Sequence, residues 1–141
     1  MAGYSATPLV QKLGIKAHAR VALLNPPTDF EQTLGKLPEG VQLQKHVRGE
    51  ALDVIVFFTA SRRELEKRFA DLAGRLSPAG GLWISWPKKA SGLATDLTEN
   101  VVREVGLQAG LVDNKICAVD EVWSGLRFVI RLKDRPKKDF T

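Results

Sequence analysis

The stretch Asp53-Val-Ile-Val-Phe-Phe58, together with the helical pattern of residues 61–76 that follows it, decides the fold. The first six residues are almost continuously apolar, which is typical of a strand buried on both faces of a parallel sheet. Ser61 with Glu64 three residues later forms a capping box, which predicts the start of a helix. Apolar side chains then recur along one helix face, at Leu65, Phe69, Leu72 and Leu76. A buried strand followed by an amphipathic helix predicts a strand–helix unit of an α/β fold.

Towards the C-terminus, the pattern predicts another helix and three more strands. Pro78-Ala-Gly-Gly81 ends the helix, and Asp96 with Glu99 caps the next one, whose inner face is Val101, Val102 and Val105. A Ser-Gly turn at Trp123-Ser-Gly125 predicts a hairpin between the last two strands. The predicted strands are 82–86, 115–122 and 126–132.

Towards the N-terminus, the pattern predicts two short helices and two strands. The first helix covers Pro8–Leu13, capped by Thr7 and ended by a left-handed Gly14. The second starts at Thr28, with Glu31 completing a capping box. The predicted strands are 19–24, which stops at Asn25-Pro26-Pro27, and the weaker 41–44.

This order predicts an α/β fold: a doubly wound, mostly parallel sheet of five to six strands with a C-terminal antiparallel hairpin. A chain of 141 residues fits one domain. We assign this domain to residues 1–132 and a basic, flexible tail to residues 133–141. The net charge is +5, but residues 131–141 hold five basic and two acidic side chains, which leaves only +2 for the rest.

Composition excludes several classes of protein. No apolar run approaches a membrane span, and the N-terminus has no secretion signal, so the sequence predicts a cytoplasmic protein. The lone Cys117 is interpreted as a buried, inert thiol. With His18 and His46 it is too scattered to build a metal cluster. The sequence therefore predicts no metal and no cofactor.

Three segments in order resemble class I methyltransferases. Residues 13–24 resemble the lead-in and first strand of that family, Leu52-Asp-Val-Ile-Val56 its fourth strand, and Leu76-Ser-Pro-Ala-Gly-Gly-Leu-Trp-Ile84 the segment into its fifth. The resemblance implies a Rossmann-like scaffold and, in an active member, binding of S-adenosylmethionine.

The departures from that family concern the cofactor. A glycine-rich turn follows the family's first strand, because the backbone there approaches the cofactor closely. Here the turn is Asn25-Pro26-Pro27, in which two prolines remove two backbone donors. The acidic residue expected after the second strand is replaced by Gln44, Lys45 and His46. The stretch from Asn25 to Leu52 is also too short for two strand–helix units, which implies a truncated scaffold.

The chain as a whole more closely resembles a family of small bacterial proteins grouped as a domain of unknown function. The segments that carry this resemblance are residues 3–9, Trp86-Pro-Lys-Lys-Ala-Ser-Gly92 and Ala118-Val-Asp-Glu-Val-Trp-Ser-Gly125. This resemblance implies relatives but supplies no mechanism.

In open α/β sheets, ligands bind outside the carboxyl ends of the strands. The segment Trp86–Gly92 is the richest at that edge, because Lys88 and Lys89 can hold an anion and Ser91 can donate a hydrogen bond. The alternative is a solvated connection in which Trp86 packs. The candidate ligand- or partner-binding residues are Asn25, Trp86, Lys88, Lys89, Ser91, Thr95 and Asp120.

No catalytic arrangement stands out. Thr59 and Ser61 are interpreted as helix caps, and His18 and His46 as surface residues. Asp120 and Glu121 are adjacent in a predicted strand, so their side chains face opposite ways and cannot form a paired-carboxylate site. We expect one of them to form a structural ion pair with the lysine loop, with a catalytic role as the less favoured alternative.

The leading hypothesis is a non-enzymatic binding or interaction module that recognises an anionic ligand or partner at the carboxyl edge of the sheet. Two alternatives stay open. One is an atypical S-adenosylmethionine-dependent methyltransferase or another small-molecule enzyme. The other is weak nucleic-acid binding through the basic tail, which we disfavour because the tail offers few phosphate contacts. The predicted partners are a small anion or a protein, with no membrane, and the chain is a monomer or homodimer.

Overall fold

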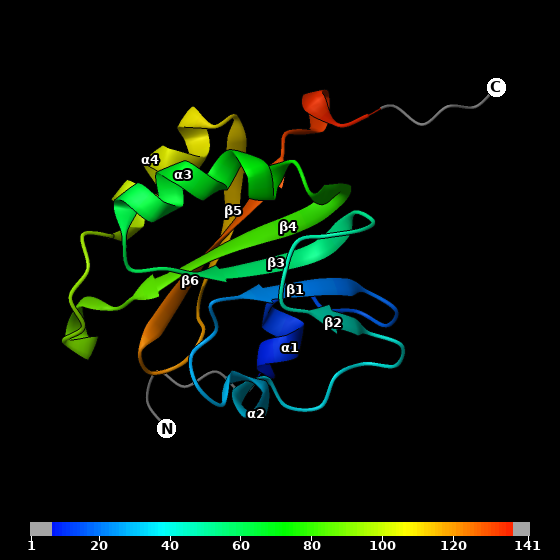
Figure 1. Ribbon diagram of the computed structural model, residues 1–141, viewed down its shortest axis with the longest axis horizontal. Helices are drawn as coiled ribbons and strands as arrows, with labels where there is room; N and C mark the ends of the chain where they lie inside the picture. The colour runs from blue at the N-terminus through cyan, green and yellow to red at the C-terminus, as the bar shows by residue number, and fades with distance from the viewer. Residues whose placement is uncertain (1–6, 137–141) are drawn as a thin grey trace.

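Residues 7–136 are described by a computed structural model, in which six strands form one sheet in the order β2-β1-β3-β4-β6-β5 (Figure 1). Strands β2, β1, β3 and β4 are parallel, and β6 runs antiparallel to both β4 and β5. This confirms the predicted fold class. The elements are α1 (Leu9–Lys12), β1 (Arg20–Leu24), α2 (Phe30–Leu34), β2 (Gln42–Gln44), β3 (Leu52–Phe58), α3 (Arg62–Ala73), β4 (Leu76–Pro87), η1 (Lys89–Ser91), α4 (Glu99–Gln108), β5 (Leu111–Ala118), β6 (Trp123–Ile130) and η2 (Leu132–Asp134).

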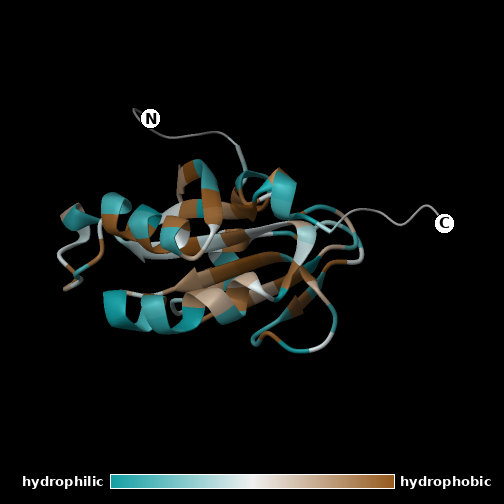
Figure 2. Cartoon of the chain, turned by 90° about the horizontal axis from the view of Figure 1, so that it is seen from above, coloured by the Kyte–Doolittle hydropathy of each residue, from teal (hydrophilic) through white to brown (hydrophobic). Residues whose placement is uncertain are grey.

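Helices cover both faces of the sheet. Figure 1 shows α3 and α4 on one face and α1 and α2 on the other. Alternate strand residues divide between the two layers: Ile55 and Phe57 pack in the core with α3, whereas Val54 and Val56 pack in the core with α1 and α2. The apolar strands lie between helices whose outer sides are hydrophilic (Figure 2). Burial on both faces explains the continuous apolar run of β3.

Only one helix and one strand, α2 and β2, lie between β1 and β3. The predicted loss of a strand–helix unit is therefore visible in the topology. In place of a helix, the segment of residues 45–51 connects β2 to β3, and Val47 packs against the core on the α3 side of the sheet.

Trp83 links β4 to the segment that follows α1. Its side chain is fully buried, and its Nε1–H donates a hydrogen bond to the carbonyl of Leu13 (3.0 Å). Trp123 is half-buried and packs edge-on against Phe58, with ring centroids 5.3 Å apart. Both tryptophans thus pack with the apolar core on the α1 and α2 side of the sheet.

Both N-terminal helices start later than predicted. The N-cap residue of α1 is Pro8 rather than Thr7, because Pro8 keeps an extended conformation, and Gly14 is left-handed as predicted. The capping box at Thr28 is not formed. The N–H of Phe30 donates to the carbonyl of Pro27 in a turn, Asp29 adopts a left-handed conformation, and α2 begins only at Phe30.

The helix-ending turn predicted at Pro78–Gly81 is wrong. Helix α3 ends at Ala73 with Gly74 as its C-cap, and β4 already begins at Leu76. The pairing of β3 with β4 jumps from Leu52–Leu76 to Val54–Gly81, so the intervening residues bulge out of the ladder. Proline and glycine here mark an irregular strand start rather than a turn.

The C-terminal hairpin turns at a different place. Trp123, Ser124 and Gly125 belong to β6, and the connection is the preceding four residues, 119–122. The Asp120 carboxylate accepts hydrogen bonds from the N–H groups of Val122 and Trp123 (both 2.8 Å), and this fixes the turn. The pairing of β5 with β6 also shifts between Asp113 and Lys115.

Asp96 does not cap α4. Thr98 is the N-cap of that helix and accepts a hydrogen bond from the N–H of Val101 (3.2 Å). Asp96 instead accepts a hydrogen bond from the N–H of Arg62 (2.7 Å), at the start of α3. The sequence pattern predicts the wrong helix for this cap, because the hydrogen-bond partner of Asp96 lies in α3.

The segment predicted as a flexible tail begins inside regular structure. Residues 132–134 form η2, and the Nε–H of Arg135 donates to the carbonyl of Ile130 (3.0 Å). Residues 137–141, like residues 3–6 of the family resemblance, lie outside the described residues. Within residues 7–136, no helix combines the length and hydropathy needed to span a membrane.

Candidate functional site

The carboxyl ends of β1, β2, β3 and β4 meet at one edge of the sheet, on the left of Figure 1. At the end of β1, Asn25 adopts a left-handed conformation (φ 54°) and is exposed. Asparagine is one of the few residues besides glycine that tolerates this conformation. The chain therefore turns sharply at Asn25 even though the two prolines follow.

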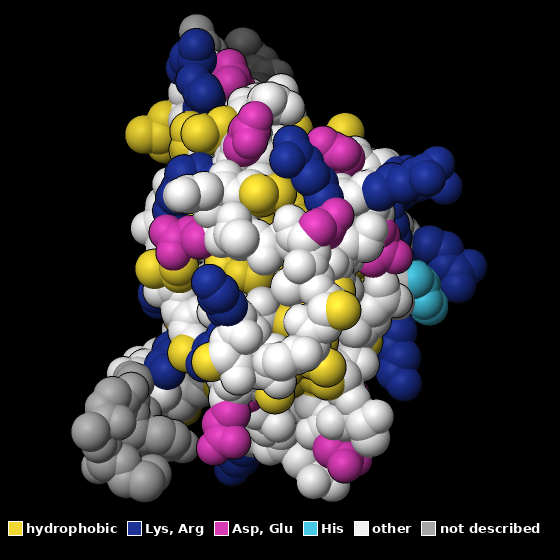
Figure 3. All heavy atoms as spheres, turned by 90° about the vertical axis from the view of Figure 1, so that its left-hand side faces the viewer, with side chains coloured by type: hydrophobic (Ala, Val, Ile, Leu, Met, Phe, Trp, Pro, Cys, Tyr) yellow, Lys and Arg dark blue, Asp and Glu magenta, His cyan; other side chains and the backbone are white. Residues whose placement is uncertain are grey.

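A hollow of about 420 Å³ lies beside Asn25, and we call it the basic hollow. It is lined by Leu24, Asn25, Lys45, His46, Val47, Arg48 and Arg68. Three of these side chains carry a positive charge, and none is a carboxylate. Figure 3 views this edge directly and shows Lys and Arg side chains gathered along its right-hand side, with a histidine among them.

Gln44 shapes the segment that forms one wall of the hollow. Its Nε2 donates to the carbonyl oxygens of His46 (2.5 Å) and Arg48 (3.0 Å), so residues 45–48 curl around the amide. The Gln44 Oε1 accepts from Arg20 at 3.4 Å. Since Val47 is anchored in the core, the side chains of Lys45, His46 and Arg48 are left at the surface.

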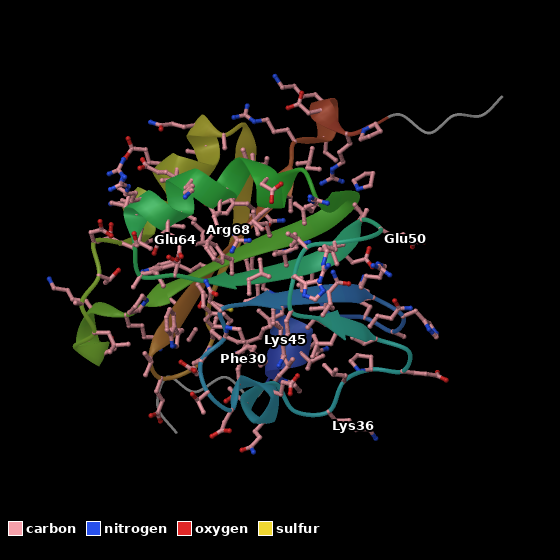
Figure 4. The ribbon with its side chains drawn as sticks, in the orientation of Figure 1. Phe30, Lys36, Lys45, Glu50, Glu64 and Arg68 are labelled. Atoms are coloured by element: carbon pink, nitrogen blue, oxygen red, sulfur yellow. The ribbon has the colours of Figure 1, made fainter. Side chains whose placement is uncertain are left out.

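Arg68 supplies the opposite wall from α3. Its guanidinium lies 5.1 Å from the ring centroid of Phe57, a cation–π contact that holds the long side chain against the end of β3. Figure 4 shows Arg68 pointing from α3 towards the sheet, with Lys45 on the other side of β3 and β1. The hollow thus brings together charges from α3 and from the segment after β2.

Two neighbouring hollows continue the basic hollow. One, about 530 Å³, shares Arg68 and runs along α3; the other, about 460 Å³, shares Lys45 and reaches Phe30 of α2. Both contain carboxylates: Glu64 and Asp71 in the first, Asp29 and Glu31 in the second. A ligand with an anionic centre therefore meets hydrogen-bond acceptors on either side of it.

Most polar side chains of the predicted Trp86–Gly92 loop have structural roles. Trp86 is buried in the core, which confirms the alternative interpretation of that residue. The Ser91 hydroxyl donates to the carbonyl of Lys88 (2.6 Å) and accepts from the N–H of Leu93 (3.2 Å). Lys89 is exposed and Lys88 half-buried, so these two lysines are the groups of the loop left for a ligand.

The other candidate residues are also engaged. Thr95 donates to the carbonyl of Ala60 (2.7 Å) and accepts from the N–H of Leu97 (3.0 Å). The predicted strand position of Asp120 and Glu121 is wrong, because both residues lie in the hairpin turn between β5 and β6. The Asp120 carboxylate caps the turn, and among the described residues no ion pair joins it to Lys88 or Lys89.

The structure therefore separates the predicted candidates into two groups. The backbone N–H of Lys88 donates to the carbonyl of Val122 (2.7 Å), which places the lysine loop against the hairpin turn. Asn25 lies apart from them, with Lys45, His46, Arg48 and Arg68. The sequence identified Lys45 and His46 only as replacements for an acidic residue. Nothing in the pattern pointed to Arg68, because an exposed arginine on an amphipathic helix looks like any solvated residue.

Thr59 and Ser61 act as caps, as predicted. Ser61 is the N-cap of α3 and accepts from the N–H of Glu64 (3.1 Å). The returning half of the capping box differs: the Glu64 carboxylate accepts from the Thr59 hydroxyl (2.5 Å), and the N–H of Ser61 donates to that hydroxyl oxygen (3.2 Å). Neither hydroxyl is held by a histidine, as a nucleophile would be.

The architecture is a methyltransferase-like Rossmann fold, and the solved structures similar to it include S-adenosylmethionine-dependent methyltransferases. An enzyme of this kind from Aquifex aeolicus superposes with a TM-score of 0.58 at 14% identity, over 85% of this chain and 86% of that one. The N-methyltransferase NodS from Bradyrhizobium japonicum gives 0.60 at 13% identity, over 85% and 90%. Magnesium protoporphyrin IX methyltransferase from Synechocystis gives 0.55 at 12% identity, over 86% and 78%.

At these identities the similarity establishes the fold alone. No family model matches the chain, and no curated protein matches it. The resemblance to a small bacterial family accordingly stays a prediction.

The residues at the carboxyl edge do not fit S-adenosylmethionine. Its sulfonium is a cation, and the basic hollow presents three cationic side chains to it. The ribose hydroxyls need an acceptor after the second strand, but the Gln44 amide is already bound to Arg20 and to backbone carbonyls. The turn after β1 also lacks the backbone donors that two prolines remove.

Proposed function

We propose that this chain is a binding module, without catalysis of its own, that recognises an anionic ligand at the carboxyl edge of its methyltransferase-like sheet. The proposal places the ligand in the basic hollow. The observation that carries it is the lining of that hollow: Lys45, Arg48 and Arg68, with His46 and the Asn25 amide beside them and no carboxylate.

The charges of the hollow are not balanced from within. Arg62, Arg75 and Arg103 on α3 and α4 each pair with a carboxylate, whereas none of these ion pairs includes a residue that lines the basic hollow. Like charges gathered in a concave site repel one another, and an oxyanion relieves that repulsion. Arginine suits such a ligand because its planar guanidinium donates two parallel hydrogen bonds to a phosphate or carboxylate.

Lys88 and Lys89 take a secondary place in this proposal. They follow β4 at the same edge of the sheet, but Ser91, Thr95 and Asp120 around them are committed to internal hydrogen bonds. The two lysines therefore add long-range attraction rather than a shaped site.

The test is calorimetric titration with inorganic pyrophosphate at constant ionic strength. We expect Arg48→Ala and Arg68→Ala each to weaken binding by about tenfold or more, since each removes charge-assisted hydrogen bonds. Lys36→Ala is the matched control, because Lys36 is an exposed cation away from the hollow (Figure 4). Binding that all three variants retain, or no binding by the wild-type chain, would refute the proposal.

The second candidate function is an atypical methyltransferase, which the fold of the similar structures favours. The three cationic side chains of the basic hollow disfavour this candidate, because the sulfonium of S-adenosylmethionine is itself a cation. A thermal shift with S-adenosylmethionine but none with pyrophosphate would reverse the order of the two candidates.

A further inference from the structure

A second cluster of arginines lies at the opposite edge of the sheet, where β6 ends. Arg127 belongs to β6, Arg131 follows its last residue, and Arg135 comes after η2. All three are half-buried rather than free in solvent. This cluster is independent of the basic hollow, which lies at the carboxyl ends of the parallel strands.

Backbone geometry, one hydrogen bond and one charge effect place the three residues near the end of β6. Arg127 and Arg131 are four residues apart in extended backbone, so their side chains leave the same face of the strand. After η2 the chain folds back, and the Nε–H of Arg135 donates to the carbonyl of Ile130, the residue before Arg131. Arg135 is also close enough to Arg127 for its charge, after burial, to lower the pKa of Arg127.

The surroundings of Arg127 and Arg131 differ from those of solvated arginines. A Cβ placed on Gly81 of β4 would collide with the guanidinium of Arg127, so this side chain lies flat on the neighbouring strand where only a glycine leaves room. The Nε of Arg131 is buried without a hydrogen-bond partner. An unpaired, buried donor costs free energy unless a ligand satisfies it.

Within residues 7–136 no ion pair neutralises these arginines. The five ion pairs of the described part involve Arg62, Arg75 and Arg103 only. Asp113 on the neighbouring strand pairs with Arg103, and Asp53 accepts from the N–H of Arg20 and the hydroxyl of Ser77. Three half-buried cations without a carboxylate partner among residues 7–136 are unusual, because proteins pair such charges.

We propose that Arg127, Arg131 and Arg135 form a second oxyanion site, which takes a phosphate group. Guanidinium groups recognise phosphate with paired hydrogen bonds. A doubly charged oxyanion would accept a hydrogen bond from the Arg131 Nε–H and offset the repulsion between Arg127 and Arg135. The phosphate belongs either to a small phosphorylated molecule or to a nucleic-acid backbone.

The test observes the arginine Nε–H resonances by NMR while inorganic pyrophosphate is added to the full-length protein at constant ionic strength. We expect the resonances of all three arginines to shift, and Arg127→Met to weaken this binding by about tenfold or more. Arg75→Met is the matched control, because Arg75 is a more exposed arginine already paired with Asp71.

Arg127→Met also separates a binding role from a structural one. Without ligand, removal of a half-buried, unpaired charge should leave the melting temperature equal or higher. In an Arg48→Ala/Arg68→Ala background, which removes binding by the basic hollow, the rise caused by pyrophosphate should disappear when Arg127→Met is added. Unmoved arginine resonances, or shifts that persist in Arg127→Met, would overturn the proposal.

Titration with oligouridylate identifies the source of the phosphate. Tight binding that falls steeply with salt and is lost in Arg127→Met assigns the site to a nucleic-acid backbone. Binding of pyrophosphate without binding of oligouridylate assigns it to a small phosphorylated molecule. Arg48→Ala and Arg68→Ala should leave this second site intact, so the outcome is independent of the basic hollow.

Discussion

Replacement of Gly106 with alanine is expected to destabilise the protein, although alanine is the better helix former. Gly106 lies inside α4 and is buried against the ring of Phe128. A Cβ at this position would come within 2.5 Å of both Cδ1 and Cζ of that ring. Ordinary van der Waals contact begins at 3.4 Å, so the ring or the helix has to move.

The magnitude follows from two opposed effects. The change from glycine to alanine in a helix interior contributes about 1 kcal/mol in favour of folding. Overpacking costs about 1–3 kcal/mol, and the upper end applies here because Phe128 is fully buried. Phe69 also packs edge-on against it, with ring centroids 5.2 Å apart, and blocks its retreat. We expect a net loss of about 2 kcal/mol in the free energy of unfolding.

Urea unfolding, followed by tryptophan fluorescence, measures this loss. The control is the same substitution in a Phe128→Leu background, where the smaller side chain leaves room for the Cβ. There Gly106→Ala should cost little or raise the stability, as helix propensity alone predicts. If Gly106→Ala raised the free energy of unfolding in the otherwise wild-type protein, the reasoning would be refuted, and α4 would have to shift freely over the sheet.

Three further predictions concern single side chains. Asp96→Ala should lower the free energy of unfolding by about 1 kcal/mol, because α3 loses an N-terminal acceptor; urea unfolding checks this. Asp120→Ala should cost about 1–2 kcal/mol by the same assay, because two N–H groups of the hairpin turn lose their acceptor, whereas Lys89→Ala should cost nothing measurable. Burial raises the pKa of the Cys117 thiol above its ordinary 9.0, so stability should fall as the pH rises past that value. Cys117→Ser should remove this dependence in unfolding experiments across that range.

The sheet was predictable from sequence because its signals are local and strong. The five-residue apolar run Val54–Phe58 identifies β3, and the capping residue and the apolar stripe of α3 lie within a single segment. The order of strands and helices then leaves few topologies, which is why the parallel sheet and the antiparallel end were correctly predicted.

The errors fall at caps and turns, where neighbouring residues carry equally good local signals. Asp96 looks like the cap of the following helix, but it bonds to α3, 34 residues earlier. Ser124-Gly125 looks like a turn, but Asp120 fixes the turn a few residues before it. A glycine next to a serine carries no information about which of two adjacent turns the rest of the fold permits.

From the sequence, only the edge of the sheet at which the candidate site lies could be predicted, and not the residues that line it. The rule for open α/β sheets places it at the carboxyl ends of the strands, and Asn25 lies there as expected. The basic hollow depends on Arg68 reaching across Phe57, and on residues 45–48 curling around the Gln44 amide. The first is a cation–π contact between two elements and the second is a side-chain-to-backbone contact, and neither leaves a periodic pattern in the sequence.

The two outer strands of the sheet have a consequence for how this protein meets copies of itself. On one side, β2 is only three residues long. On the other, β5 carries an exposed Ile116, which would suit lateral growth of the sheet into a polymer, but its pairing is broken between Asp113 and Lys115. A strand with a bulge and an exposed lysine is a poor template for another strand. Neither edge strand, β2 or β5, therefore favours fibril-like aggregation.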